Sequence, residues 1–191
     1  MSFKGVMRPG HAAIRVLDMQ ESVKYYVERI GLIKTDEDDQ GRVYLKAWDE
    51  HDRFSIVLRE ADSPGIDHMA FKVYSTADLD EFEGKLNDYG QNVERIPANE
   101  LKGCGERVRF DSPSGHTFEL YAEKEVLGNG LGRKNPDPWP EGLKGMQVYR
   151  FDHCLLYGSN SKGTVDIFRE VLGFDLTEEV VDNQIEVNGQ L

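Results

Sequence analysis

The sequence has 191 residues, 39% of them hydrophobic, a length that suggests one complete domain followed by a remainder. The formal net charge of -12 argues against a nucleic-acid or anionic-membrane partner, because such a binding face needs clustered Lys or Arg side chains to displace counterions. No run approaches the roughly 18 apolar residues of a membrane span, and the N-terminus lacks the apolar segment of a signal peptide, so we expect a cytoplasmic protein.

One sequence unit recurs along the chain. The segment that begins at His11 aligns with the segment that begins at His153, at an offset of 142 residues (153 minus 11), and the register holds for about 25 residues. Each copy predicts a short strand, a helix, a glycine where the helix ends, and a second strand. In the first copy, apolar residues at helical spacing occupy 23–30, and Gly31 follows them.

A third, looser copy of this unit begins with a predicted strand at 66–73. It continues in an acidic helix at 77–89, which Gly90 closes, and returns in a strand at 92–96. Further strands are predicted at 43–48, 54–59, 107–111 and 117–122. We therefore expect an α+β fold in which repeated βαβββ modules form a cupped, mixed sheet with the helices outside.

Composition divides the chain into three parts. Residues 1–126 hold two complete modules, and the glycines and prolines of residues 127–147 predict an interdomain linker. Residues 148–191 begin a third module whose last strands are not encoded, which leaves an apolar helix face and a strand edge without partners. We therefore expect residues 148–191 to be disordered, to pair with the same segment of another chain, or to be completed by a further stretch of the parent protein.

Strand alternation predicts which side chains face the concave side of the sheet. Successive residues of a strand point to opposite faces, so His11, His68 and Glu119 lie opposite the apolar residues that pack under the helices. Such a trio suits a 2-His-1-carboxylate site, in which three protein ligands bind one face of a ferrous ion. The alternative is that these residues hydrogen-bond to one another or to water in a metal-free domain.

Four segments resemble catechol 2,3-dioxygenases, which are extradiol dioxygenases of the vicinal oxygen chelate superfamily. They lie at 5–11, 41–48, 112–121 and 150–158, and the resemblance covers essentially the whole chain. It implies the fold shared by glyoxalases, bleomycin-resistance proteins and extradiol dioxygenases. It also implies a non-catalytic N-terminal domain of two modules, followed by a C-terminal domain of two modules that holds Fe(II).

The resemblance implies specific residue roles and a reaction. His153, in the first strand of the third module, matches the first of three iron ligands, while the other ligands and the catalytic residues would lie beyond Leu191. The implied reaction is extradiol (meta) cleavage of a catechol by dioxygen at non-haem Fe(II), giving a 2-hydroxymuconic semialdehyde in aromatic compound degradation. Family members are typically tetrameric, so a homo-oligomer is expected. Residues 1–191 alone are not expected to be active, because one imidazole cannot supply the three-ligand face.

Two other function classes stay open at this point. A metal-dependent lyase or isomerase of the glyoxalase type would use His11, His68 and Glu119, although the strand at 54–58 offers no carboxylate as a fourth ligand. A metal-free binding or assembly domain would need no such ligands. The match at 150–158 favours the dioxygenase, because a self-sufficient two-module protein has no use for the start of a third module.

Overall fold

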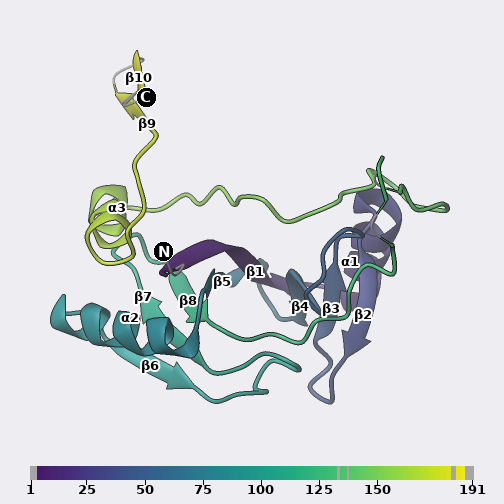
Figure 1. The fold of residues 1–191 in the computed structure, drawn as a ribbon, viewed down its shortest axis with the longest axis horizontal. Helices are drawn as coiled ribbons and strands as arrows, with labels where there is room; N and C mark the ends of the chain where they lie inside the picture. The colour runs from purple at the N-terminus through teal and green to yellow at the C-terminus, as the bar shows by residue number, and fades with distance from the viewer. Residues whose placement is uncertain (1–3, 133, 137, 182–183, 188–191) are drawn as a thin grey trace.

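The computed structural model describes residues 4–132, 134–136, 138–181 and 184–187. Two βαβββ modules share one eight-stranded sheet with the strand order β2-β3-β4-β1-β5-β8-β7-β6 (Figure 1). The first module contains β1 (Val6–Val16), α1 (Met19–Tyr25), the π-helix η1 (Tyr26–Ile30), β2 (Ile33–Glu37), β3 (Val43–Lys46) and β4 (Ile56–Glu60). The second contains β5 (Gly65–Val73), α2 (Thr76–Asp88), β6 (Val93–Ile96), β7 (Arg107–Asp111) and β8 (Thr117–Tyr121). The predicted α+β fold is confirmed.

The strand register brings three polar residues to the middle of the sheet. Each module pairs its first strand with its last in parallel, β1 with β4 and β5 with β8, and β1 pairs with β5 antiparallel to join the modules. In this register His11 lies opposite Ala70, and His68 lies opposite Ala13. Ala70 in turn lies beside Glu119 on β8. Because side chains alternate along a strand, all three polar side chains point to one face of the seam between the modules.

Local sequence signals set where the helices begin and end. The side chain of Asp18 accepts the backbone N–H of Glu21 at the start of α1, and Ser75 caps α2 in the same way. Gly31 ends the first helical segment with φ of 91°, a left-handed conformation that glycine adopts at little cost. Within the described residues, no helix combines the length and the apolar character needed to cross a bilayer.

The core lies on both faces of the curved sheet. The helices α1 and α2 cover opposite ends of one face (Figure 1). Buried residues beneath α1 include Val16, Leu45 and Leu58, and those packed with α2 include Val73, Val108 and Leu120. The concave face is filled as well, by a cluster of Ala13, Tyr44, Phe54, Val57, Ala70, Leu101, Cys104 and Tyr121. The polar residues of the seam are therefore surrounded by protein.

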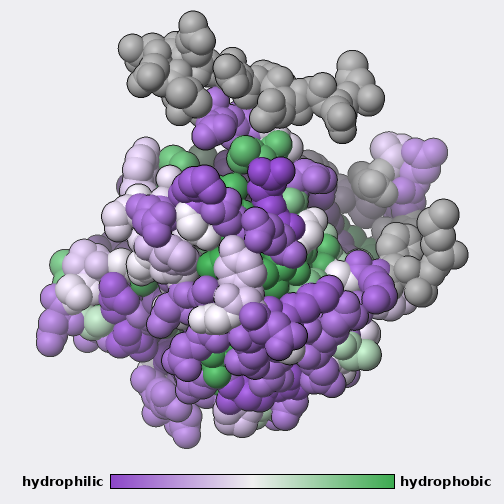
Figure 2. Space-filling model, turned by 90° about the vertical axis from the view of Figure 1, so that its left-hand side faces the viewer, coloured by the Kyte–Doolittle hydropathy of each residue, from purple (hydrophilic) through white to green (hydrophobic). Residues whose placement is uncertain are grey.

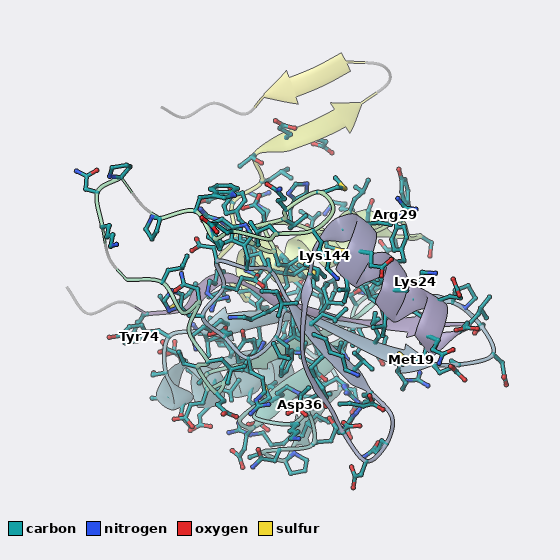
Figure 3. All side chains as sticks on the ribbon, turned by 90° about the vertical axis from the view of Figure 1, so that its right-hand side faces the viewer. Met19, Lys24, Arg29, Asp36, Tyr74 and Lys144 are labelled. Atoms are coloured by element: carbon teal, nitrogen blue, oxygen red, sulfur yellow. The ribbon has the colours of Figure 1, made fainter. Side chains whose placement is uncertain are left out.

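The segment that follows β8 runs back along the molecule. It first contacts the α1 end, where the indole Nε1–H of Trp48 donates to the Gln147 carbonyl at 3.2 Å. Arg29 of η1 and Lys144 of this segment lie near each other in Figure 3, and the backbone N–H of Met146 donates to the Arg29 carbonyl at 2.9 Å. The chain then crosses to the α2 end (Figure 1). The boundaries between domains stay a prediction.

The helix α3 (Ser161–Glu170) packs on the helix-covered face of the second module. Ile167 is fully buried there, and the ring of Phe168 lies 4.9 Å from that of Phe118 and 5.6 Å from that of Phe71, measured between centroids. The prediction that the apolar face of this helix has no partner is therefore wrong, because the sheet of the second module covers that face. Figure 2 views this end of the molecule and shows apolar surface among the polar residues there.

The rest of the third unit also departs from the prediction. The short strand expected at the start of the copy that begins at His153 is not formed. Residues 153–158 are irregular, and no strand of the described residues pairs with them. Farther along, β9 (Glu178–Val181) and β10 (Gln184–Val187) form a separate antiparallel sheet of two strands. The prediction for 148–191 also includes residues 182–183 and 188–191, which lie outside the described residues.

Candidate functional site

The three residues that alternation placed on one face converge at the buried seam. Nε2 of His11 lies 3.2 Å from Nε2 of His68, which lies 3.3 Å from Oε2 of Glu119. The three potential ligand atoms are all within 4.8 Å of one another. Neighbouring donors around one metal ion are about 3.0–3.5 Å apart when the bonds are about 2.1 Å long. The spacing of these donors therefore suits a metal ion.

Two arginines hold the carboxylate of Glu119. Arg107 donates from Nε to Oε2 at 2.7 Å, and Arg109 donates from Nε and Nη2 to Oε1 at 2.8 and 2.6 Å. Glu119 and Arg107 are fully buried. Charge-assisted bonds of this kind are among the stronger ones in proteins. Both oxygens of Glu119 are thus engaged, and the sequence reasoning missed these arginines.

A lysine holds the other ring nitrogen of His11. Nζ of Lys124 lies 3.2 Å from Nδ1 of His11 and donates to the Phe54 carbonyl at 3.1 Å. An ammonium group only donates, so Nδ1 must accept, and the neutral imidazole then carries its proton on Nε2. That N–H donates to Nε2 of His68. The lone pairs that a metal ion would need on both histidines are therefore occupied.

Burial and the neighbouring cations keep both histidines neutral. Burial, with smaller effects from Lys124, His68 and Arg107, holds the pKa of His11 well below its usual value. Burial also lowers the pKa of His68, although Glu119 opposes the shift. Burial lowers the pKa of Lys124 to about 8, so the ammonium form still dominates at pH 7. Two guanidinium groups contact the buried carboxylate and an ammonium group contacts His11, so a divalent metal ion does not fit this cluster as it stands.

His153 lies in different surroundings. Its side chain is 86% exposed, and Nδ1 lies 3.2 Å from the carboxylate of Asp152. It lines a pocket of about 410 Å³ together with aromatic residues of the sheet and of α3, among them Phe71, Phe118 and Phe168. A histidine whose Nδ1–H donates to a carboxylate presents the Nε2 lone pair, the arrangement that metal-binding histidines use. Among the described residues, His153 belongs to no group of three potential ligands.

Comparisons with known proteins agree with this fold. Residues 66–125 match the family described as the catechol 2,3-dioxygenase-like N-terminal domain. The chain is 57% identical to metapyrocatechase of Pseudomonas sp. (strain CF600) over 181 residues, which are 94% of the chain and 59% of that protein. The crystal structure of the 2,3-dioxygenase LapB from Pseudomonas sp. KL28 superposes with a TM-score of 0.85 and 49% identity, covering 90% of the chain and 60% of LapB.

A relative from another enzyme class also matches. Lactoylglutathione lyase of Escherichia coli O157:H7 is 30% identical over an alignment of 140 residues, which covers 66% of the chain and 99% of the lyase. Paired modules alone do not separate dioxygenases from lyases, since fold does not fix function. The identity is much higher for metapyrocatechase, and the chain spans about three fifths of the length of this metapyrocatechase and of LapB. The chain therefore belongs to the catechol 2,3-dioxygenase family of extradiol dioxygenases.

Proposed function

We propose that the protein containing this chain is a catechol 2,3-dioxygenase that acts in aromatic compound degradation. It would open the ring of a catechol next to the diol, using dioxygen and a non-haem Fe(II) centre, and give a 2-hydroxymuconic semialdehyde. The observation that carries the proposal is the 57% identity with metapyrocatechase over 94% of the chain. The ferrous ion would supply one centre at which the catechol oxygens and dioxygen are brought together.

His153 is the residue of this chain that would hold the iron. Asp152 supports this role because its carboxylate accepts the proton of Nδ1 and leaves the lone pair of Nε2 for the metal. The aromatic pocket beside His153 would suit an aromatic substrate. The remaining ligands would come from the part of the dioxygenases that this chain does not span.

The proposed division of labour follows from the same comparison. Residues 1–126 would form a non-catalytic N-terminal domain, residues 127–147 a linker, and residues 148–191 the beginning of the iron-binding domain. The unbroken sheet from β1 to β8 supports the first of these. A cytoplasmic homo-oligomer is part of the proposal, and light scattering after size-exclusion chromatography of the full-length protein would test its assembly.

The proposal is tested with the full-length protein and the substitution His153→Ala. We expect loss of bound iron and a decrease in kcat of about 1,000-fold or more, because a ligand of the ion that activates both reactants is removed. Formation of the ring-opened semialdehyde is followed by absorbance, and iron is measured in the same samples. His51→Ala, at an exposed histidine, is the matched control. An unchanged iron content in His153→Ala would refute the assignment.

A glyoxalase-like activity is the second candidate, and two observations support it. The first is the cluster of His11, His68 and Glu119, and the second is the match to the whole length of lactoylglutathione lyase. The cations around the cluster oppose it. We expect no lactoylglutathione turnover by residues 1–191 with added Zn(II), Ni(II) or Fe(II). Turnover that disappears in His11→Gln would instead favour the lyase.

A further inference from the structure

The donor atoms of the seam are spaced like metal ligands, but their neighbours are hydrogen-bond donors. A metal-binding histidine normally donates its second N–H to a carboxylate or a carbonyl group, which leaves the other nitrogen free for the metal. At His11 the order is reversed, because Nδ1 faces the ammonium group of Lys124 at 3.2 Å. The neighbour of His11 is therefore of the wrong kind for a ligand.

We propose that Lys124 excludes divalent metal ions from this cluster by fixing the tautomer of His11. The ammonium group holds the lone pair at Nδ1, and the single ring proton then sits on Nε2, the atom that faces His68 and Glu119. A metal ion could bind His11 only after that proton moved to Nδ1, where it would point at the ammonium group. This role goes beyond ring cleavage and does not depend on it.

The position of Lys124 leaves its ammonium group little freedom. Nζ donates to the Phe54 carbonyl at 3.1 Å and lies 3.5 Å from the Gly10 carbonyl. It also lies 4.1 Å from the ring centroid of Phe54 and 4.4 Å from that of Tyr121, within the range of cation–π attraction. These contacts offset part of the cost of burying the charge. They keep the ammonium group beside His11.

The two arginines, and not Lys124, occupy the carboxylate of Glu119. Arg109 is the more accessible of its two arginines, with 32% of its side chain exposed, and it lines a polar pocket of about 530 Å³ together with His68. An ion that entered this pocket would meet His68 first and would find Glu119 paired with Arg109 and Arg107. The lysine and the arginines thus act on different ligands. Replacing Lys124 alone should free His11 to act as a metal ligand. Replacing Arg109 in addition should release one oxygen of Glu119.

The test is a titration of residues 1–191 with Co(II), followed by visible absorption and by calorimetry. We compare the wild type with Lys124→Met, which has a similar length but no donor, and with Lys124→Met/Arg109→Met. Only binding that is lost when His11→Gln is added counts as binding at the seam. We expect no such binding in the wild type and at least about 100-fold tighter Co(II) binding in the double variant. Lys162→Met, at an exposed lysine, is the control and should leave binding unchanged.

A second measurement does not depend on the variants. The ¹⁵N chemical shifts of the His11 ring in the wild type should show a bare Nδ1 and a protonated Nε2. The opposite tautomer would overturn the proposal, and so would His11-dependent Co(II) binding by the wild type. The proposal would also be wrong if the double variant has a wild-type circular dichroism spectrum and a cooperative unfolding transition but no His11-dependent binding.

Discussion

His11 and His153 begin matching copies of one sequence unit, but the two histidines have opposite neighbours. Nδ1 of His11 lies 3.2 Å from the ammonium group of Lys124 in a fully buried seam. Nδ1 of His153 lies 3.2 Å from the carboxylate of Asp152 on the surface. The ammonium group requires His11 to carry its proton on Nε2. The carboxylate accepts a hydrogen bond from Nδ1 of His153 and leaves Nε2 of that ring bare. The charge beside Nδ1, rather than the place in the repeat, separates the two proposed roles.

The largest expected effect concerns the buried side of this comparison. Glu119→Gln should lower the free energy of unfolding of residues 1–191 by about 3 kcal/mol, because it removes the buried negative charge that both guanidinium groups contact. Arg107 keeps Glu100 as a partner and Arg109 keeps Glu94. Urea denaturation measures the decrease. Glu123→Gln, at an exposed glutamate four residues along, should change the value by less than about 0.5 kcal/mol. An equally small change in the free energy of unfolding for Glu119→Gln would mean that the seam contributes little to stability.

The surface side of the comparison is tested at Asp152. In the full-length protein, Asp152→Asn should weaken iron binding about 10- to 100-fold, because the amide no longer holds the Nδ1 proton of His153 as strongly. In residues 1–191 the same change should alter the free energy of unfolding by less than about 0.5 kcal/mol, as expected for an exposed pair. Metal analysis and urea denaturation give the two values. Asp62→Asn serves as the surface control, and equal iron affinity in both variants would argue against the role of Asp152.

The smallest effect sharpens the comparison through pH. Burial lowers the folded-state pKa of Lys124 from its ordinary value of 10.5 to about 8, so between these values the unfolded chain binds the proton more strongly. The stability of the folded state therefore rises with pH across this window. Relative to Lys124→Met, the wild type should gain about 1.5 kcal/mol of unfolding free energy between pH 8 and 9.5. A difference that stays constant over this range would show that the lysine is not desolvated.

Much of the fold and part of the seam could be predicted from the sequence. Alternation placed His11, His68 and Glu119 on one face because the strand period is short and local. One of the two arginines could also have been predicted, because the turn between β7 and β8 sets a register in which Arg109 lies opposite Glu119. Counting outward from that turn would have identified Arg109 as a partner of the carboxylate.

Other features depend on contacts that no local pattern encodes. Lys124 follows the last strand of the second module, and its side chain reaches a histidine 113 residues earlier in the chain. The helix α3 has an apolar face that the sequence shows clearly, but its resting place against Phe71 and Phe118 is a matter of tertiary packing. The strand expected at 153–158 lacks a neighbouring strand among the described residues, and a strand needs one to satisfy its backbone groups. Its local pattern alone was not sufficient.

The central position of β1 has a consequence for how the chain folds as it is synthesised. This strand, the first of the two modules, lies between β4 and β5, which end at Glu60 and Val73. Neither neighbour has been synthesised when β1 leaves the ribosome. The backbone groups of β1 therefore lack both strand partners until more than half of the two modules has emerged. At about 5–20 residues per second this delay lasts several seconds. During that time the apolar residues of β1 are accessible to a chaperone or to another nascent chain.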